Sequence, residues 1–384
     1  MIKQMVKMNF KFLFNDTVHM KIGGRAWYDA VYDLTDQYPP DVEDNMRKEL
    51  LLRDAYLDFF LPNLNIRLGH QQVVWGESLG QFFADVVNPR DLRYFLLPTF
   101  QYIRLQIWAL DLRYFFLPNA TWEIVVTPDQ TVDKLALPGS DFAFFIPPPP
   151  EGFNQVLLPD DRPSTNFKDW NVGTRITFLT HGWDFSWLYY TSLDHLPANF
   201  KTIGMDASGN PTIFLTPTHT RIHQYGFTFS KGIKSNVFRG EAVVTQGRFF
   251  NSTDPSVNDG VTKKNLLRYF LGIDASLGGK VDFTGEFQQQ IVMGNLSDLA
   301  DPSLDSWILL HFETGFLDEK LVPEITFIVG LRKGDTYIGP KLHFFVKPSL
   351  RLTWGADIFT GPLDTFYGEF RNSSRVFMNT QWRF

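Results

Sequence analysis

The 384-residue chain contains no cysteine. Disulfide bonds, thiolate nucleophiles and thiolate-based zinc sites are therefore excluded. Basic residues form no cluster, and 36 Lys and Arg stand against 42 Asp and Glu, for a net charge of −6. This mildly acidic balance argues against nucleic acid as a partner.

Long hydrophobic runs are also absent. No charge-free apolar window reaches the roughly 18 residues that a membrane-spanning helix needs. The first residues lack the charged and then apolar pattern of an export signal. We therefore expect either a cytosolic chain or a mature or trimmed form of an exported one.

Aromatic side chains are abundant, at 16% of the residues, yet the mean hydropathy is −0.15. This combination indicates apolar residues interleaved with polar ones, as on strands whose successive side chains point to opposite faces. Strict alternation recurs along the chain. It predicts 17 strands, near residues 7–15, 18–33, 48–61, 63–73, 102–117, 120–128, 168–180, 183–194, 219–230, 235–250, 265–277, 280–293, 306–317, 321–333, 335–347, 349–360 and 374–384.

The connections between these strands mostly alternate between tight turns and long polar loops, which is typical of an outer-membrane barrel. The alternative is a soluble β-sandwich or propeller. Three features argue against a soluble fold. Nearly every strand carries charged residues on its polar face, aromatic residues lie near strand ends, and the meander is uninterrupted. The predicted fold is an all-β, transmembrane, antiparallel up-and-down β-barrel that forms one domain over residues 1–384.

The last strand reads VFMNTQWRF, and its Trp382 and Phe384 resemble the signal that the bacterial barrel-assembly machinery recognises. Asn379 and Phe377 depart from that signal, and an ordinary edge strand is the alternative. Outer-membrane lipid and lipopolysaccharide are further expected partners.

Strand parity adds an expectation about the whole protein. Single-chain bacterial barrels have an even number of strands and periplasmic termini. We therefore expect about 18 strands, or 16 if one run is wrongly divided, with an export signal and at least one strand before Met1.

Residues 76–80 match G-x-S-x-G, the nucleophile elbow of serine hydrolases. That motif needs a parallel sheet, whereas every later strand belongs to an antiparallel hairpin. His311 and His343 lie on polar strand faces with no outward serine beside them, which also disfavours an outer-membrane phospholipase. The acidic loops 33–44 and 298–305 are explained as solvated loops, so no enzyme, cofactor or metal site is predicted.

Residues 48–129 resemble the DUF1302 family of Gram-negative outer-membrane proteins. The resemblance depends on a strand and the segment that follows it, at Arg67, Leu68, Gly69, Gln71, Val74, Trp75, Gly76, Glu77, Asp85, Asn88, Pro89 and Asp91. It continues through 25–34, 137–150 and 173–190. His70 stands where the family usually has Arg.

This resemblance implies an integral protein of the bacterial outer membrane. Family members are often encoded near resistance-nodulation-division type exporters and a periplasmic lipoprotein-like partner. It further implies movement of hydrophobic compounds or lipids across the envelope.

The insertion at 74–101 cannot face lipid as irregular backbone, so we expect it to enter the barrel as a plug or constriction. An ordinary extracellular loop is the alternative. A short helix is expected over 78–87, capped by Ser78 or Glu77. Its charged residues are expected to pair with Arg67, Asp54, Asp58, Arg25 or Lys21. The predicted plug residues are Trp75, Gly76, Glu77, Asp85, Asn88, Pro89, Arg90, Asp91 and Arg93.

Charges of both signs on the polar faces are predicted to line the lumen and to pair across it. They are Arg25, Asp29, Asp54, Asp58, Arg67, Arg113, Arg175, Arg239, Glu241, Arg268, Asp274, Glu286, Arg332, Arg351 and Asp357. The leading hypothesis is a channel or transport conduit narrowed by 74–101 and gated by long loops such as the Pro-rich 129–167. The alternative is a scaffold barrel that docks an envelope partner without conducting.

Overall fold

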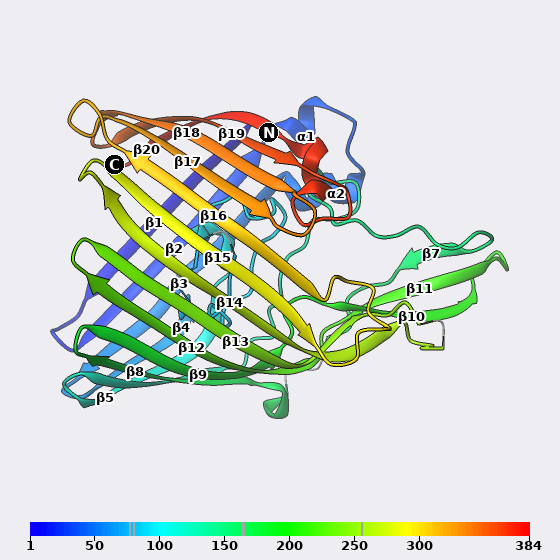
Figure 1. The fold of residues 1–384 in the computed structure, drawn as a ribbon, viewed down its shortest axis with the longest axis horizontal. Coiled ribbons are helices and arrows are strands. Elements are labelled where there is room, and N and C mark those ends of the chain that lie inside the picture. Colours follow the sequence, from blue (N-terminus) through cyan, green and yellow to red (C-terminus); the bar gives the residue numbers. More distant parts are fainter. Residues whose placement is uncertain (77, 80, 163–165, 255) are drawn as a thin grey trace.

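One antiparallel sheet of 17 strands forms the body of the protein (Figure 1). The computed structural model describes all residues except 77, 80, 163–165 and 255. The strands of this sheet are β1 (Lys3–Leu13), β2 (Val18–Asp29), β3 (Lys48–Leu61), β4 (Leu64–Gln71), β5 (Ile107–Leu117), β6 (Ala120–Thr127), β8 (Asn171–Thr180), β9 (Trp183–Leu193), β12 (Arg221–Ile233), β13 (Asn236–Asn251), β14 (Val261–Leu277), β15 (Val281–Met293), β16 (Leu304–Thr314), β17 (Leu321–Gly330), β18 (Thr336–Lys347), β19 (Leu350–Thr360) and β20 (Arg375–Trp382). Every strand expected from the sequence is present.

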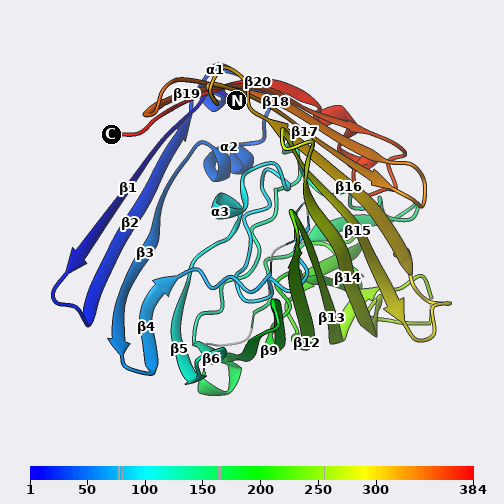
Figure 2. The same ribbon diagram turned by 60° about the vertical axis from the view of Figure 1, so that its left-hand side comes forward.

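Each strand of this sheet pairs with the next one in chain order. The ladders run from β1–β2, with Lys3 opposite Asp29, to β19–β20, with Leu350 opposite Trp382. The sheet curls into a barrel around an interior space that we call the lumen (Figure 2). Among the described residues, no ladder joins β1 to β20. The chain reaches β1 from the rim of the long loops and leaves β20 at the rim of the tight turns.

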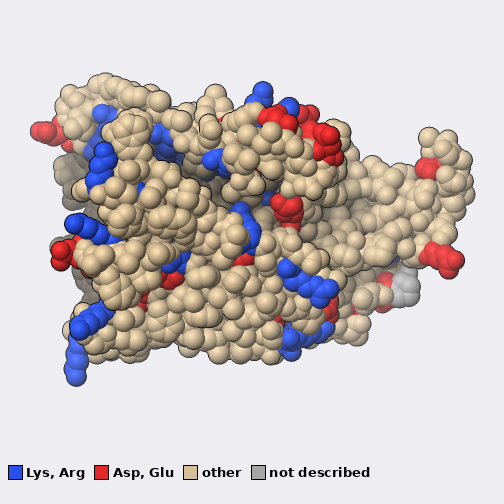
Figure 3. Space-filling model, turned by 90° about the horizontal axis from the view of Figure 1, so that it is seen from above, with Lys and Arg blue, Asp and Glu red and all other residues tan. Residues whose placement is uncertain are grey.

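Three further strands lie in the long loops and form a separate small sheet, which we call the flap. They are β7 (Asn154–Leu157), β10 (Ala198–Met205) and β11 (Pro211–Thr218). β10 and β11 form a hairpin, and β7 joins β11 in parallel. The flap projects from the loop end of the barrel (Figure 1), and Figure 3 shows few charges on it. The alternation pattern predicts no strand in any of these three stretches.

Helices are few and short: α1 (Val31–Leu34), α2 (Pro40–Met46), α3 (Phe100–Ile103) and the 3-10 turns η1 (Phe167–Asp169) and η2 (Gly368–Ser373). α2 begins at a proline, whose fixed φ suits the first helical position. Over the described ranges, no helix has the length and apolar character needed to cross a membrane.

The two faces of the wall differ as the alternation predicts. On β9, Trp187 is 50% exposed and points outward, whereas the adjacent Leu188 is only 5% exposed. The outward rings of neighbouring strands touch, with Trp187 and Phe227 separated by 5.3 Å between centroids. Aromatic residues on the outer face near strand ends are typical of the interfacial girdle of membrane barrels.

Gly69, in the strand shared with the family motif, occupies a backbone conformation that other residues avoid. Its φ is 135°, and a Cβ at this position would lie 2.2 Å from the carbonyl oxygen of Ala55 on β3. Only glycine therefore allows β3 and β4 to keep their spacing here.

We predict that Gly69→Ala lowers the free energy of unfolding by about 3 kcal/mol or more, because strain and a backbone clash act together. The urea midpoint, read from the heat-modifiable migration of the folded barrel on gels, measures this change. Gly232→Ala is the matched control, because a Cβ there meets nothing within 4 Å. A midpoint for Gly69→Ala equal to that of Gly232→Ala would contradict the prediction.

Candidate functional site

The segment between β4 and β5, residues 72–106, lies within the lumen (Figure 2). We call it the inserted segment. It is longer than the expected 74–101 because β5 begins at Ile107 rather than near 102. Asn88 joins its two arms: the backbone N–H of Val73 donates to Asn88 Oδ1 at 2.7 Å, and Asn88 Nδ2 donates to the carbonyl of Leu105 at 2.6 Å.

Polar side chains of the wall hold the backbone of this segment. Glu286 on β15 accepts hydrogen bonds from the N–H of Leu79 at 3.0 Å and the hydroxyl of Ser78 at 3.2 Å. Glu241 on β13 accepts from the N–H of Ala84 at 2.8 Å, and Gln288 Nε2 donates to the carbonyl of Leu79 at 2.7 Å.

The prediction of a helix over 78–87 was therefore wrong, because no described residue of this stretch is helical. The N–H groups of Leu79 and Ala84 bond to wall carboxylates in place of backbone carbonyls one turn earlier. Ser78 accordingly contacts Glu286 and caps no helix. Glu77, the other expected cap and a predicted plug residue, lies outside the described residues.

Apolar packing fixes the start of the inserted segment. The buried Trp75 meets Tyr190 of β9 edge-on, with 6.0 Å between ring centroids. It passes directly over Gly173 of β8, where a Cβ would lie 2.8 Å from the Trp75 ring. At Gly76 a Cβ would lie 2.5 Å from the backbone nitrogen of Asp85. The glycine of the motif thus permits a close approach of backbone to backbone.

Charged residues of the inserted segment pair with other partners than expected. Arg93 binds Asp91 at 2.7 Å and Glu49 at 2.5 Å, and Arg104 binds Asp85 at 2.5 Å. The expected partners are engaged elsewhere, because Asp58 pairs with Arg67 at 2.6 Å and Asp54 with Lys21 at 3.0 Å.

Burial raises the pKa of these carboxyl groups, whereas pairing with a cation lowers it. Burial alone would raise the pKa of Asp91, but the hydrogen bonds and charge of Arg93 hold it below its ordinary value. For Asp85, burial outweighs the neighbouring Arg104 and raises the pKa. Burial likewise raises the pKa of Asp133 to about 6, although the Arg90 N–H donates to this carboxylate at 2.7 Å.

Pro89, another predicted plug residue, also connects the two arms of the inserted segment, because its carbonyl accepts the N–H of Leu105 at 2.8 Å.

Most of the predicted lumen charges form ion pairs along the wall, between strands that lie close together in the sheet. The ion pairs seen among the described residues do not cross the lumen as expected. The pairs are Arg113 with Asp111 and Glu123, Arg175 with Glu123, Arg239 with Asp274 and Glu286, Arg332 with Asp305, and Asp357 with Arg375.

The remaining predicted residues lie in other surroundings. Arg25 and Arg268 lie 5.2 Å and 5.9 Å from the rings of Tyr102 and Phe83 in the inserted segment. Asp29 accepts the N–H groups of Ile2 and Val31 at the loop rim. Arg351 donates to Gln381. Trp382 and Phe384, which are predicted to signal assembly, are exposed.

Arg53 is a contact residue that the sequence analysis missed. It is buried, donates to the carbonyl of Gln101 at 2.5 Å and lies 5.5 Å from the Tyr102 ring. The β2–β3 register passes from Asp54 directly to Leu52, so Arg53 is the extra residue of a bulge. Strict alternation assigns such a residue to the wrong face.

A cavity of about 270 Å³ remains between residues 95–99, which we call the tip of the inserted segment, and the wall of β16, β17 and β18. One part of its lining is polar, with His311, Glu324 and Lys341. The rest is mostly apolar, formed by Leu79, Phe95, Leu96, Leu97, Pro98, Leu309, Ile328, Tyr337 and Tyr367. Such a lining suits a ligand with an apolar body and a polar end.

Comparison with known proteins agrees with this architecture. The family model described as "Protein of unknown function (DUF1302)" matches residues 1–310. No curated protein matches the chain.

Solved structures that match are outer-membrane β-barrel porins at low sequence identity. OpdL of Pseudomonas aeruginosa shares 12% identity at a TM-score of 0.50, over 99% of this chain and 92% of that one. OccK9 (OpdG) of the same organism shares 10% at 0.52, over 94% and 86%. OccK8 (OprE), also from Pseudomonas aeruginosa, shares 9% at 0.52, over 94% and 88%. The chain thus has the fold of an outer-membrane porin.

We predict that Asn88→Ala loosens the inserted segment, because it leaves the buried Val73 N–H and Leu105 carbonyl without their partner. A decrease of about 2 kcal/mol in the free energy of local opening corresponds to roughly 30-fold faster exchange. Amide hydrogen exchange at Val73 measures it in the detergent-solubilised barrel.

The control for this prediction is Asn119→Ala, which removes an exposed asparagine that also donates to a backbone carbonyl. Exchange at Val73 should stay unchanged in this control. Equal exchange in Asn88→Ala and the wild type would show that the two arms are held by other contacts.

Proposed function

The chain belongs to the DUF1302 family and folds as an outer-membrane β-barrel, and on this premise we propose that it is a channel or conduit for hydrophobic or lipid-like compounds. The observation that carries this proposal is the cavity between the inserted segment and β16–β18, whose lining is mostly apolar with a polar part at His311, Glu324 and Lys341. We propose that the inserted segment narrows the lumen at that level.

The apolar lining is the reason for choosing this class of compound. A pore for small ions or sugars needs a wet, polar constriction, whereas Leu97, Leu309 and Ile328 line the cavity here. Wall charges already satisfied by their neighbours add little attraction for ions of either sign. An amphipathic compound could place its apolar body on these side chains and its polar end near Lys341.

The proposed orientation places the tight turns and the end of β20 on the periplasmic side and the long loops and flap outside, as in other barrels. The tight-turn rim is then the surface available to a periplasmic lipoprotein or a resistance-nodulation-division type exporter. These partners are proposed from the family resemblance.

A non-conducting scaffold is the second candidate. Its supporting observation is the flap, which presents the exposed Ile203 and Met205 beyond the barrel. A catalytic role for Ser78 is not proposed, because its hydroxyl binds the carboxylate of Glu286.

We predict that replacing residues 74–104 with a short Gly-Ser linker raises single-channel conductance several-fold in planar bilayers. A short linker can join Val73 to Leu105, because these two residues are close enough for the side chain of Asn88 to bond to both. Removing the segment also removes the apolar contacts that fill the lumen beside β5, β6, β9 and β13.

The matched control shortens the flap by removing residues 201–215 and joining β10 to β11 with a tight turn at the Phe200–Thr216 pair. This control should conduct like the wild type. If the barrel stays silent with and without the inserted segment, the channel is contradicted, and copurification of a partner would then support the scaffold.

We also predict that Leu97→Ser weakens binding of an apolar fluorescent naphthylamine to the purified barrel by about tenfold, the equivalent of one buried leucine side chain. Fluorescence titration in detergent measures it. Leu331→Ser, at an exposed turn, should leave the affinity unchanged. Equal affinities in the two variants would place the probe outside this cavity.

A further inference from the structure

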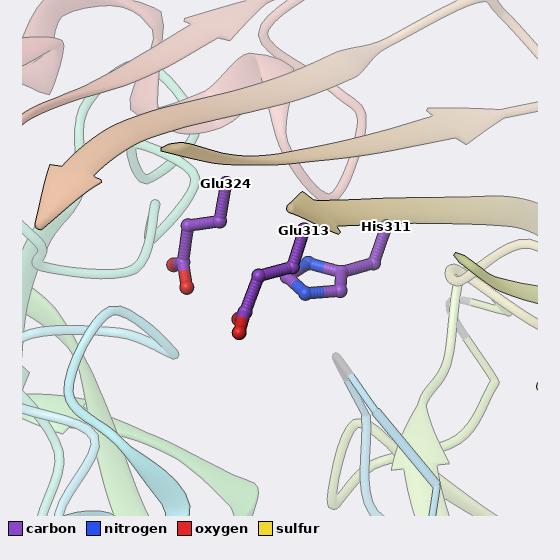
Figure 4. Close-up of side chains that lie close together, drawn as sticks. All are labelled: His311, Glu313 and Glu324. Atoms are coloured by element: carbon purple, nitrogen blue, oxygen red, sulfur yellow. The ribbon is translucent and has the colours of Figure 1, made fainter. Parts of the chain in front are cut away.

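Three potential metal ligands converge on the lumen side of β16 and β17. His311 and Glu313 are two residues apart on β16, and Glu324 lies opposite Glu313 on β17. One donor atom from each lies within 4.8 Å of the others. Figure 4 shows the three side chains extending into the same space. All three are half-buried, so an ion could reach them from the lumen.

The histidine is held in an orientation that suits metal binding. The hydroxyl of Thr326, directly opposite on β17, lies 2.9 Å from His311 Nδ1. Nε2 is therefore the ring nitrogen available to a metal. Histidines that bind metals characteristically have their other ring nitrogen fixed in this way.

A second histidine repeats the arrangement on the next strand. Thr353 Oγ1 lies 2.8 Å from Nδ1 of His343, and Nε2 of that histidine lies 3.2 Å from Glu324 Oε2. The other oxygen of Glu324 binds Lys341 at 2.6 Å. Two independent Thr–His pairs thus direct imidazole nitrogens toward one carboxylate.

We propose that His311, Glu313 and Glu324 bind a divalent transition-metal ion, with His343 beside Glu324 at the edge of the site. One imidazole and two carboxylates suit Zn²⁺ and similar ions, whereas Ca²⁺ and Mg²⁺ prefer oxygen ligands alone. The site joins β16, β17 and β18 near their tight turns and borders the polar part of the cavity. It does not depend on what the lumen conducts.

The test uses the untagged, full-length chain in detergent, stripped with a chelator and titrated with ZnCl₂ by calorimetry. We expect one ion per chain at micromolar affinity or better, with no competition from excess Mg²⁺. His311→Ala and the nearly isosteric Glu313→Gln should each weaken binding at least tenfold. Absence of saturable Zn²⁺ binding by the wild type would overturn the proposal.

Matched controls separate this site from surface binding. His223→Ala removes an exposed histidine that contacts Tyr189, and Glu319→Gln changes a carboxylate in the tight turn after β16. Both should bind Zn²⁺ like the wild type. Retention of native heat-modifiable migration shows that each variant is folded. If a folded Glu313→Gln binds Zn²⁺ as tightly as the wild type, the site is wrong.

Thr326→Val tests the positioning role of the threonine, because it removes the hydroxyl and keeps the shape. We expect about tenfold weaker binding, the lower end of the range for partners that orient a ligand. X-ray absorption at the zinc edge of the wild type should show imidazole scattering in a shell of nitrogen and oxygen. A shell of oxygen alone would overturn the assignment of His311.

Discussion

Irregular backbone inside a membrane barrel must have its polar groups satisfied by protein or by water in a cavity. This constraint explains the use of Glu241 and Glu286, whose carboxylates accept N–H groups of the inserted segment. Arg239 binds Glu286 at 2.8 Å and Asp274 at 2.8 Å, so the charge of Glu286 is itself compensated. The wall and the inserted segment therefore stabilise each other through one connected set of hydrogen bonds.

The same constraint decides where the other charges can go. Residues such as Asp58 and Arg67 pair with each other on adjacent strands, and the Arg93–Asp91–Glu49 group pairs within and beside the inserted segment. Because most of the predicted lumen charges have a close partner of opposite sign, their long-range attraction for ions is weakened. Shape and apolar contact then become the properties that discriminate between ligands.

Alternation predicted the 17 wall strands because lipid outside and a polar lumen inside impose period two on every strand. It could not predict the flap, whose strands lie outside the wall between lipid and lumen, or Arg53, which a bulge shifts to the other face. Composition alone favoured a helix over 78–87. The competing hydrogen bonds come from residues more than 150 positions away, such as Glu241 for Ala84. Local sequence carries no signal for contacts of that kind.

The inserted segment occupies the lumen asymmetrically. Trp75 and Ala84 pack against the side formed by β5, β6, β9 and β13, in a cluster that includes Tyr190 and Val243. On the opposite side, β16–β18 face the tip of the segment across the remaining cavity. Leu309 and Ile328, which line the cavity, also belong to the buried cluster around Phe95 of the inserted segment. β16 and β17 therefore both hold the tip of the inserted segment and face the open space, so a substitution on these strands alters the two together.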